Sequence, residues 1–130
     1  MSSARDRYRS NSVETASPSA RLVMIIDQLD TEFMRADRGF ECDDLFEIHC
    51  GLKNAQAIVA LLRDSLQLDV WEPAKDIYQI YQFSLDLLVK SNLKKERAPF
   101  EDAKEILAPL MAAWREAASV GSPELATVNG

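Results

Sequence analysis

Apolar residues recur at every third or fourth position in four stretches of the chain, which is the spacing of helices that bury one side. The second stretch keeps this spacing for three heptads, as the seam of a left-handed bundle does. Its seam residues are Leu45, Ile48, Leu52, Ala55, Val59, Leu62 and Leu66. The other seams consist of Leu22, Ile25, Ile26, Leu29, Phe33 and Ala36; of Ala74, Ile77, Tyr81, Ser84, Leu85 and Leu88; and of Phe100, Ala103, Leu107, Leu110, Trp114 and Ala117.

Residues that favour helix ends bound the first two stretches. Ser17 before Pro18 is typical of a helix start, because serine accepts a hydrogen bond from a free backbone N–H and proline in the first turn loses no bond. Gly39 is expected to end this helix in the left-handed conformation. Asp43 or Asp44 is expected to cap the second helix, where a carboxylate also suits the positive end of the helix dipole.

Proline marks the boundaries of the other two helices. Pro73 is suited to the first turn of the third helix, which is predicted to run to about Ser91. The fourth helix is predicted to begin near Pro99 at the latest. Pro109 lies inside it and has no N–H to bond the carbonyl of Glu105, so we expect a kink there.

The four predicted helices are joined by short connections, so neighbours in sequence should run antiparallel. The predicted fold is all-α, an antiparallel up-down-up-down four-helix bundle spanning residues 18–118. The polar segments 1–17 and 119–130 are expected to be flexible, the first as a mobile N-terminal tail. No run of alternating polar and apolar residues is long enough to predict a strand.

Two of these helices carry more apolar residues than one buried side requires. In the third, Ile80, Phe83 and Leu87 recur at i, i+3 and i+7 beside the seam, and the apolar arc covers roughly two-thirds of the circumference. In the second, Ile58 and Leu61 lie outside a complete seam. We expect these five residues to form an apolar surface for a partner on the outer flank of the two helices. The alternative is that the two stripes face each other and pack as ordinary core.

Chain length, net charge and the lack of long apolar runs restrict the kinds of partner that the protein can bind. The 130 residues suffice for one domain with a substantial core, and the formal net charge of −6 disfavours nucleic acid and anionic membrane surfaces as partners. No apolar run approaches the ~20 residues of a membrane span, and the N-terminus lacks the apolar core of a signal peptide. Cys42 and Cys50 would lie about two helical turns apart, too far for a disulfide, so reduced thiols in the cytosol are expected.

The sequence offers little for catalysis. His49 is the single histidine, and it diverges by ~100° from Cys50 on a helix, so the two side chains cannot face one metal ion comfortably. The Glu-x-x-His pairs of di-iron bundles and a glycine-rich phosphate loop are both missing. We expect a protein that is not an enzyme and needs no cofactor or metal.

Three blocks of the sequence share their order and spacing with a known family. The blocks are Tyr8 with Ser12–Pro18 (SVETASP), Ile80–Phe83 (IYQF) with Leu87–Lys95 (LLVKSNLKK), and Leu110 with Ala113–Ala117 (AWREA). They resemble the opening Y-x(n)-V-E-T-A-S-P, the helical L-Y-x-[YF] and A-N-L-K-K elements, and the closing L-x-x-A-W-x-E-A of the flagellar export chaperone FliS family. A departure is Ile25–Gln28 (IIDQ), where the family often has L-Y-D-G.

This resemblance implies a cytoplasmic chaperone that holds the disordered C-terminal segment of newly made flagellin. Such a chaperone keeps flagellin from polymerising before type III export; contact with the export apparatus stays open. Tyr8 matches the tyrosine of the opening block, and our hypothesis is that it docks over an apolar groove until a client binds. The predicted flagellin-binding residues are Tyr8, Ile58, Leu61, Ile80, Phe83 and Leu87.

A monomer that binds neither nucleic acid nor the membrane interior is expected. The alternative is a structural or regulatory bundle that self-associates as a homodimer through the same apolar flank.

Overall fold

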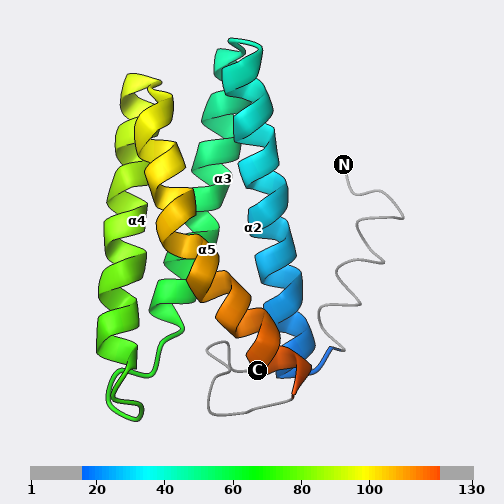
Figure 1. The fold of residues 1–130 in the computed structure, drawn as a ribbon, viewed down its shortest axis with the longest axis vertical. Helices are drawn as coiled ribbons and strands as arrows, with labels where there is room; N and C mark the ends of the chain where they lie inside the picture. Colours follow the sequence, from blue (N-terminus) through cyan, green and yellow to red (C-terminus); the bar gives the residue numbers. More distant parts are fainter. Residues whose placement is uncertain (1–15, 121–130) are drawn as a thin grey trace.

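The structure, a computed structural model, describes residues 16–120. Four helices follow one another in this range: α2 (Pro18–Glu41), α3 (Leu45–Asp64), α4 (Ala74–Lys94) and α5 (Arg97–Ser119). Each helix packs against the next, and α5 closes the ring against α2 (Figure 1). The prediction of an all-α, antiparallel four-helix bundle is confirmed, and residues 16–120 contain no strand. Tyr8 and most of the two predicted tails lie outside the described residues.

The predicted caps are present at the starts of α2 and α3. The hydroxyl of Ser17 accepts a hydrogen bond from the backbone N–H of Ala20 at 3.2 Å. Asp44 is the carboxylate that caps α3, accepting from the N–H of Glu47 at 3.1 Å. Both helices therefore begin where the sequence predicts.

The predicted seams form the core of the bundle. The side chains of Leu52, Val59 and Leu88 are fully buried, and that of Leu107 is 1% exposed. Leu45 is an exception, because it lies in the first turn of α3 at the end of the bundle and is 62% exposed. The seam of α3 therefore begins at Ile48.

The prediction that Gly39 ends the first helix is wrong. Gly39 lies inside α2, and a Cβ there would come within 2.7 Å of the backbone nitrogen of Ile48. Gly51 on α3 packs closely against α2 in the same way, because a Cβ added at Gly51 would lie 2.7 Å from the backbone nitrogen of Ala36. The two glycines let the backbones of α2 and α3 approach closely. The left-handed residue of this connection is Asp43, with φ of 52°.

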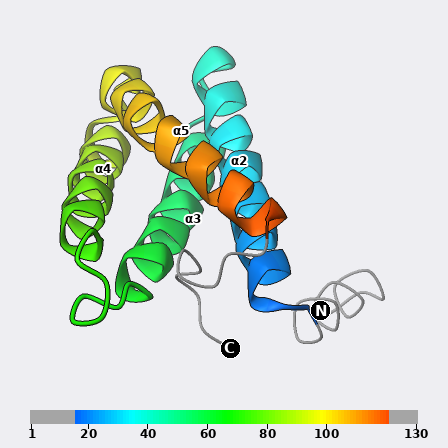
Figure 2. The ribbon, with the colours of Figure 1, turned by 60° about the horizontal axis from the view of Figure 1, so that its bottom comes forward.

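The direction of α5 changes along its length. Its first half runs beside α4, and its second half leans across the bundle toward the first turns of α2 (Figures 1 and 2). Pro109 lies inside the helix, where it cannot donate to the carbonyl of Glu105. The buried residues of α5 differ from the predicted seam at one position here. Met111 is buried, whereas Leu110, the predicted seam residue, lies half-buried at the edge of the core.

A buried hydrogen bond joins α4 and α5. The indole N–H of Trp114 donates to the hydroxyl oxygen of Tyr81 at 2.7 Å, and Tyr81 is fully buried. Burial raises the pKa of the Tyr81 hydroxyl far above its ordinary value, so the hydroxyl stays neutral. The ring of Trp71, from the α3–α4 connection, lies 6.0 Å from that of Trp114 and covers this end of the core.

Candidate functional site

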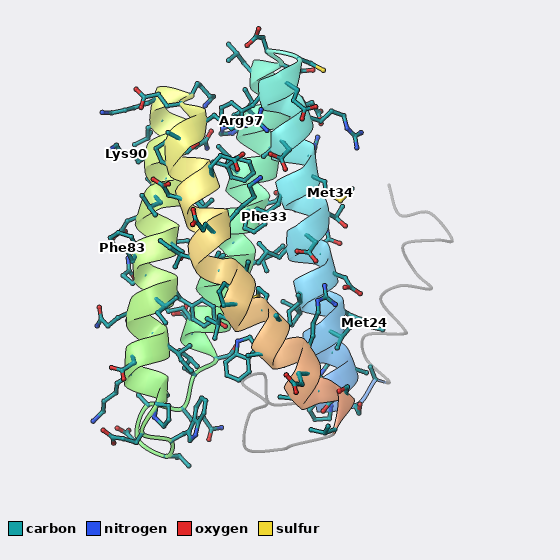
Figure 3. All side chains as sticks on the ribbon, viewed as in Figure 1. Met24, Phe33, Met34, Phe83, Lys90 and Arg97 are labelled. Atoms are coloured by element: carbon teal, nitrogen blue, oxygen red, sulfur yellow. The ribbon has the colours of Figure 1, made fainter. Side chains whose placement is uncertain are left out.

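An apolar groove with a volume of about 510 Å³ runs between α2 and α5. Core side chains reach its floor, Phe33 from α2 together with Leu107 and Met111 from α5. Met34 lines the groove on α2, and 60% of its surface is exposed. Figure 3 shows Phe33 between the two helices and Met34 on the outer side of α2. An apolar side chain of a partner would meet mainly carbon and sulfur here.

The groove exists because α5 presents small residues to it. Ala108 and Ala112 stand one helical turn apart and line the α5 side. A larger side chain at either position would fill the space opposite Met34. This part of the site was missed from the sequence, although the alanine pair beside the seam of α5 was a usable signal.

Ion pairs connect α2 and α5 at both ends of the groove. At one end, Nζ of Lys104 lies 2.8 Å from Oδ1 of Asp37. At the other, Nη2 of Arg115 lies 2.7 Å from Asp27 Oδ1 and 2.8 Å from Asp30 Oδ2. Hydrogen bonds, chiefly with Asp27 and then with Asp30, raise the pKa of Arg115 above its ordinary value. The groove thus has charged ends and an apolar middle, which suits an amphipathic segment.

The predicted site residues of α3 lie on its α2 side. Two contacts mark that side: Gly51 packs against α2, and Asn54 donates to Glu32 of α2 at 2.9 Å. Ile58 follows Asn54 by four residues and Leu61 follows it by seven, so both share this side of the helix. Ile58 is half-buried and packs against the core, and Leu61 is 49% exposed.

The predicted site residues of α4 lie on the side turned away from α3. Figure 3 shows Phe83 on the outer edge of α4, and it is 58% exposed. Gln82 faces α3 instead, since it accepts a hydrogen bond from Arg63 at 2.8 Å. Ile80 and Leu87 are each roughly 140–160° around the helix from Gln82, which puts them on the α5 side. Both are half-buried.

The expectation of one apolar surface shared by α3 and α4 is therefore corrected. The two groups face opposite sides of this helix pair, and they do not pack against each other as core either. Polar contacts occupy the junction between the helices. Besides the Arg63–Gln82 bond, Gln56 of α3 donates to the carbonyl of Leu88 at 3.5 Å. Within α4, Gln82 also donates to Asp86 at 3.0 Å.

Viewed around the bundle, the two groups flank the groove. Ile58 and Leu61 lie between α3 and α2, the groove lies between α2 and α5, and Ile80, Phe83 and Leu87 lie toward α5 on α4. The apolar positions thus follow one another around the α2–α5 side of the molecule. Tyr8 is outside the described residues.

Residues 16–120 do not bring metal-ligating side chains together. Within this range no group of three or more histidine, cysteine, aspartate or glutamate residues is placed to hold a metal ion. Cys42 and Cys50 are both free thiols. None of the four described helices is long and apolar enough to span a membrane.

Comparison with known proteins identifies the family of the chain. No curated protein sequence matches the chain. The profile of the family described as "Flagellar protein FliS" matches residues 1–121, which is nearly the whole chain and includes all four helices. The chain belongs to the FliS family of flagellar proteins.

Proposed function

We propose that this protein is a cytoplasmic chaperone for flagellin. It binds the disordered C-terminal segment of flagellin, prevents premature polymerisation and delivers the subunit for type III export. The observation that carries the proposal is the family match over residues 1–121. The apolar groove between α2 and α5 supports it, because a chaperone for an amphipathic segment needs exposed apolar surface on a stable fold.

The client is proposed to wrap around the α2–α5 side of the bundle. A segment that orders on binding must bury roughly 1,000–3,000 Å² to offset its loss of conformational entropy. One groove is too small for that, so contacts on both flanks are needed. Ile58 and Leu61 supply one flank, and Ile80, Phe83 and Leu87 supply the other. Tyr8 is proposed to contact the client as well.

A calorimetric titration with the C-terminal segment of flagellin tests this proposal. The informative variant is Ala108→Gln, which places a longer side chain in the groove at an exposed helical position. The matched control is Ala98→Gln, the same substitution at an exposed position in the first turn of α5, outside the groove. Alanine and glutamine both favour helix, so neither change should unfold the bundle.

The groove variant is expected to bind at least tenfold more weakly, which corresponds to about 1.4 kcal/mol, while the control binds like the unaltered protein. Equal affinities for the two variants would show that the client does not enter the groove. A failure of the unaltered protein to bind the segment would refute the proposed function.

A further inference from the structure

Methionine side chains gather at the groove between α2 and α5. Residues 16–120 contain three methionines, of which Met34 and Met111 line the groove, while Met24 lies nearer the start of α2 (Figure 3). Met34 is 60% exposed, whereas Met111 is 6% exposed at the groove floor. The thioether of Met34 is therefore open to small molecules in solution as long as no partner covers it.

An exposed thioether is a target for peroxides. The sulfur takes one oxygen atom from hydrogen peroxide, so that the sulfur is oxidised to a sulfoxide and the peroxide is reduced to water. The reaction converts an apolar, flexible side chain into a polar one, which disrupts interfaces that depend on methionine. Because access of the oxidant limits the reaction, Met34 should react before Met111.

The groove has no free hydrogen-bond donor for a sulfoxide oxygen. Ala108 and Ala112 form the α5 wall opposite Met34, and their side chains present only carbon. Among the described residues that line the groove, Lys104 and Arg115 carry charged donors, and aspartates of α2 already bind both. A client side chain that covers oxidised Met34 would bury the sulfoxide oxygen without a partner, which opposes binding.

Negative charge on the same face of α2 adds to this effect. Asp30 precedes Met34 by four residues and Asp37 follows it by three, so the three side chains are neighbours on the helix surface. Both aspartates line the groove. The sulfoxide oxygen carries partial negative charge, so the carboxylates repel it and do not stabilise it.

We propose that Met34 is an oxidation switch of the groove. Conversion of its thioether to the sulfoxide by hydrogen peroxide lowers the affinity for the client, and reduction of the sulfoxide restores it. The reduction requires a methionine sulfoxide reductase, in which two thiols become a disulfide and the oxygen leaves as water. This inference rests on the proposed function, because the affinity concerned is that for the flagellin segment.

Limited treatment of the full chain with hydrogen peroxide tests the proposal. Peptide mass spectrometry measures which methionine reacts, and Met34 is expected to be oxidised several times faster than Met111. Dithiothreitol then returns the free thiols of Cys42 and Cys50 to the reduced state and leaves methionine sulfoxide in place. Circular dichroism checks that the fold is retained.

Calorimetric titration with the C-terminal segment of flagellin measures the consequence. The oxidised protein is expected to bind at least tenfold more weakly, which corresponds to about 1.4 kcal/mol. Treatment with a methionine sulfoxide reductase should restore the affinity of the untreated protein. Segment bound before the peroxide is added should slow the oxidation of Met34, since it covers the thioether.

Three variants locate the effect. In Met34→Leu, peroxide should leave unchanged whatever affinity the variant has before treatment, because the reactive sulfur is gone. Met24→Leu is the matched control on the same helix outside the groove, and peroxide should lower its affinity as it does in the unaltered protein. Met34→Gln places a polar side chain of similar length at the same position without any oxidant, and it should bind at least tenfold more weakly.

The outcomes separate this inference from the proposed function. Oxidation of Met34 that leaves the affinity unchanged overturns the proposal, and so does a loss of affinity that persists in Met34→Leu. Oxidation of Met111 before Met34 also overturns it. Failure of the untreated protein to bind the segment refutes the proposed function, and the switch with it.

Discussion

At the scale of single residues, Gly51 illustrates how closely α2 and α3 pack. A Cβ at this position would lie 2.7 Å from the backbone nitrogen of Ala36 and 2.9 Å from the carbonyl oxygen of Glu32. Both are backbone atoms, which cannot move without moving the helix. In an exposed helix, alanine is favoured over glycine by about 1 kcal/mol. At Gly51 the close contact reverses this preference, so that glycine is favoured over alanine.

We therefore expect Gly51→Ala to destabilise the protein by about 1–3 kcal/mol, since the helices must separate to accept the methyl group. Urea unfolding measures the free energy of unfolding directly. An unchanged or higher stability would show that α2 and α3 are not as close as the glycine contacts require.

Phe83 and Leu88 lie on the same helix, α4, but Phe83 is on its exposed flank and Leu88 is in the core. Because it is 58% exposed, Phe83→Asp should change the free energy of unfolding by no more than about 0.5 kcal/mol. Leu88→Ala, at a fully buried residue of the same helix, should destabilise by about 2–5 kcal/mol. Thermal melting separates the two effects.

If Phe83 contacts the client, its replacement should also lower affinity for the flagellin segment about tenfold. A stable variant with normal affinity would show that Phe83 is not part of the proposed site.

At the scale of elements, α5 decides the shape of the groove. Pro109 is exposed and lies in the middle of the helix, next to Ala108 on the groove wall. Replacing it by alanine restores the hydrogen bond to the carbonyl of Glu105, although it also raises the conformational entropy of the unfolded chain. If α5 can straighten, we expect Pro109→Ala to stabilise the protein by about 1 kcal/mol. It should also weaken client binding, because the second half of α5 would no longer lean in the same way toward α2.

Chemical unfolding and titration of this variant give the two readouts. A lower stability would mean that the change of direction is needed for α5 to reach α2 and make the ion pairs of Arg115. In that case the proline supports the fold.

At the scale of the whole molecule, the sequence predicts some features well because they repeat. Seams such as Leu52–Val59 recur over several turns, so a single irregularity does not obscure them. Caps such as Ser17 and Asp44 depend on local geometry alone. These features were sufficient to predict four helices, their order and most of the core.

Features that depend on which helices meet could not be predicted. The helical spacing places Ile58 and Ile80 outside their seams, but it does not show which neighbouring helix lies beside each residue. The groove requires α2 and α5, whose residues are far apart in the chain, and its space comes from Ala108 and Ala112, which are unremarkable in helices. Gly39 resembles a helix end because the close approach of Ile48 is not visible in the sequence.

Binding of flagellin in the groove can be measured directly by methyl NMR of the full chain, labelled at its methionines, during titration with the C-terminal segment of flagellin. Met34 and Met111 line the groove and serve as probes of its occupation. Both methyl signals are expected to shift, and the change is expected to saturate at one segment per chain. Saturable binding that leaves both signals in place would contradict the groove as the binding site. Absence of any saturable change in the spectrum would contradict the proposed chaperone function itself.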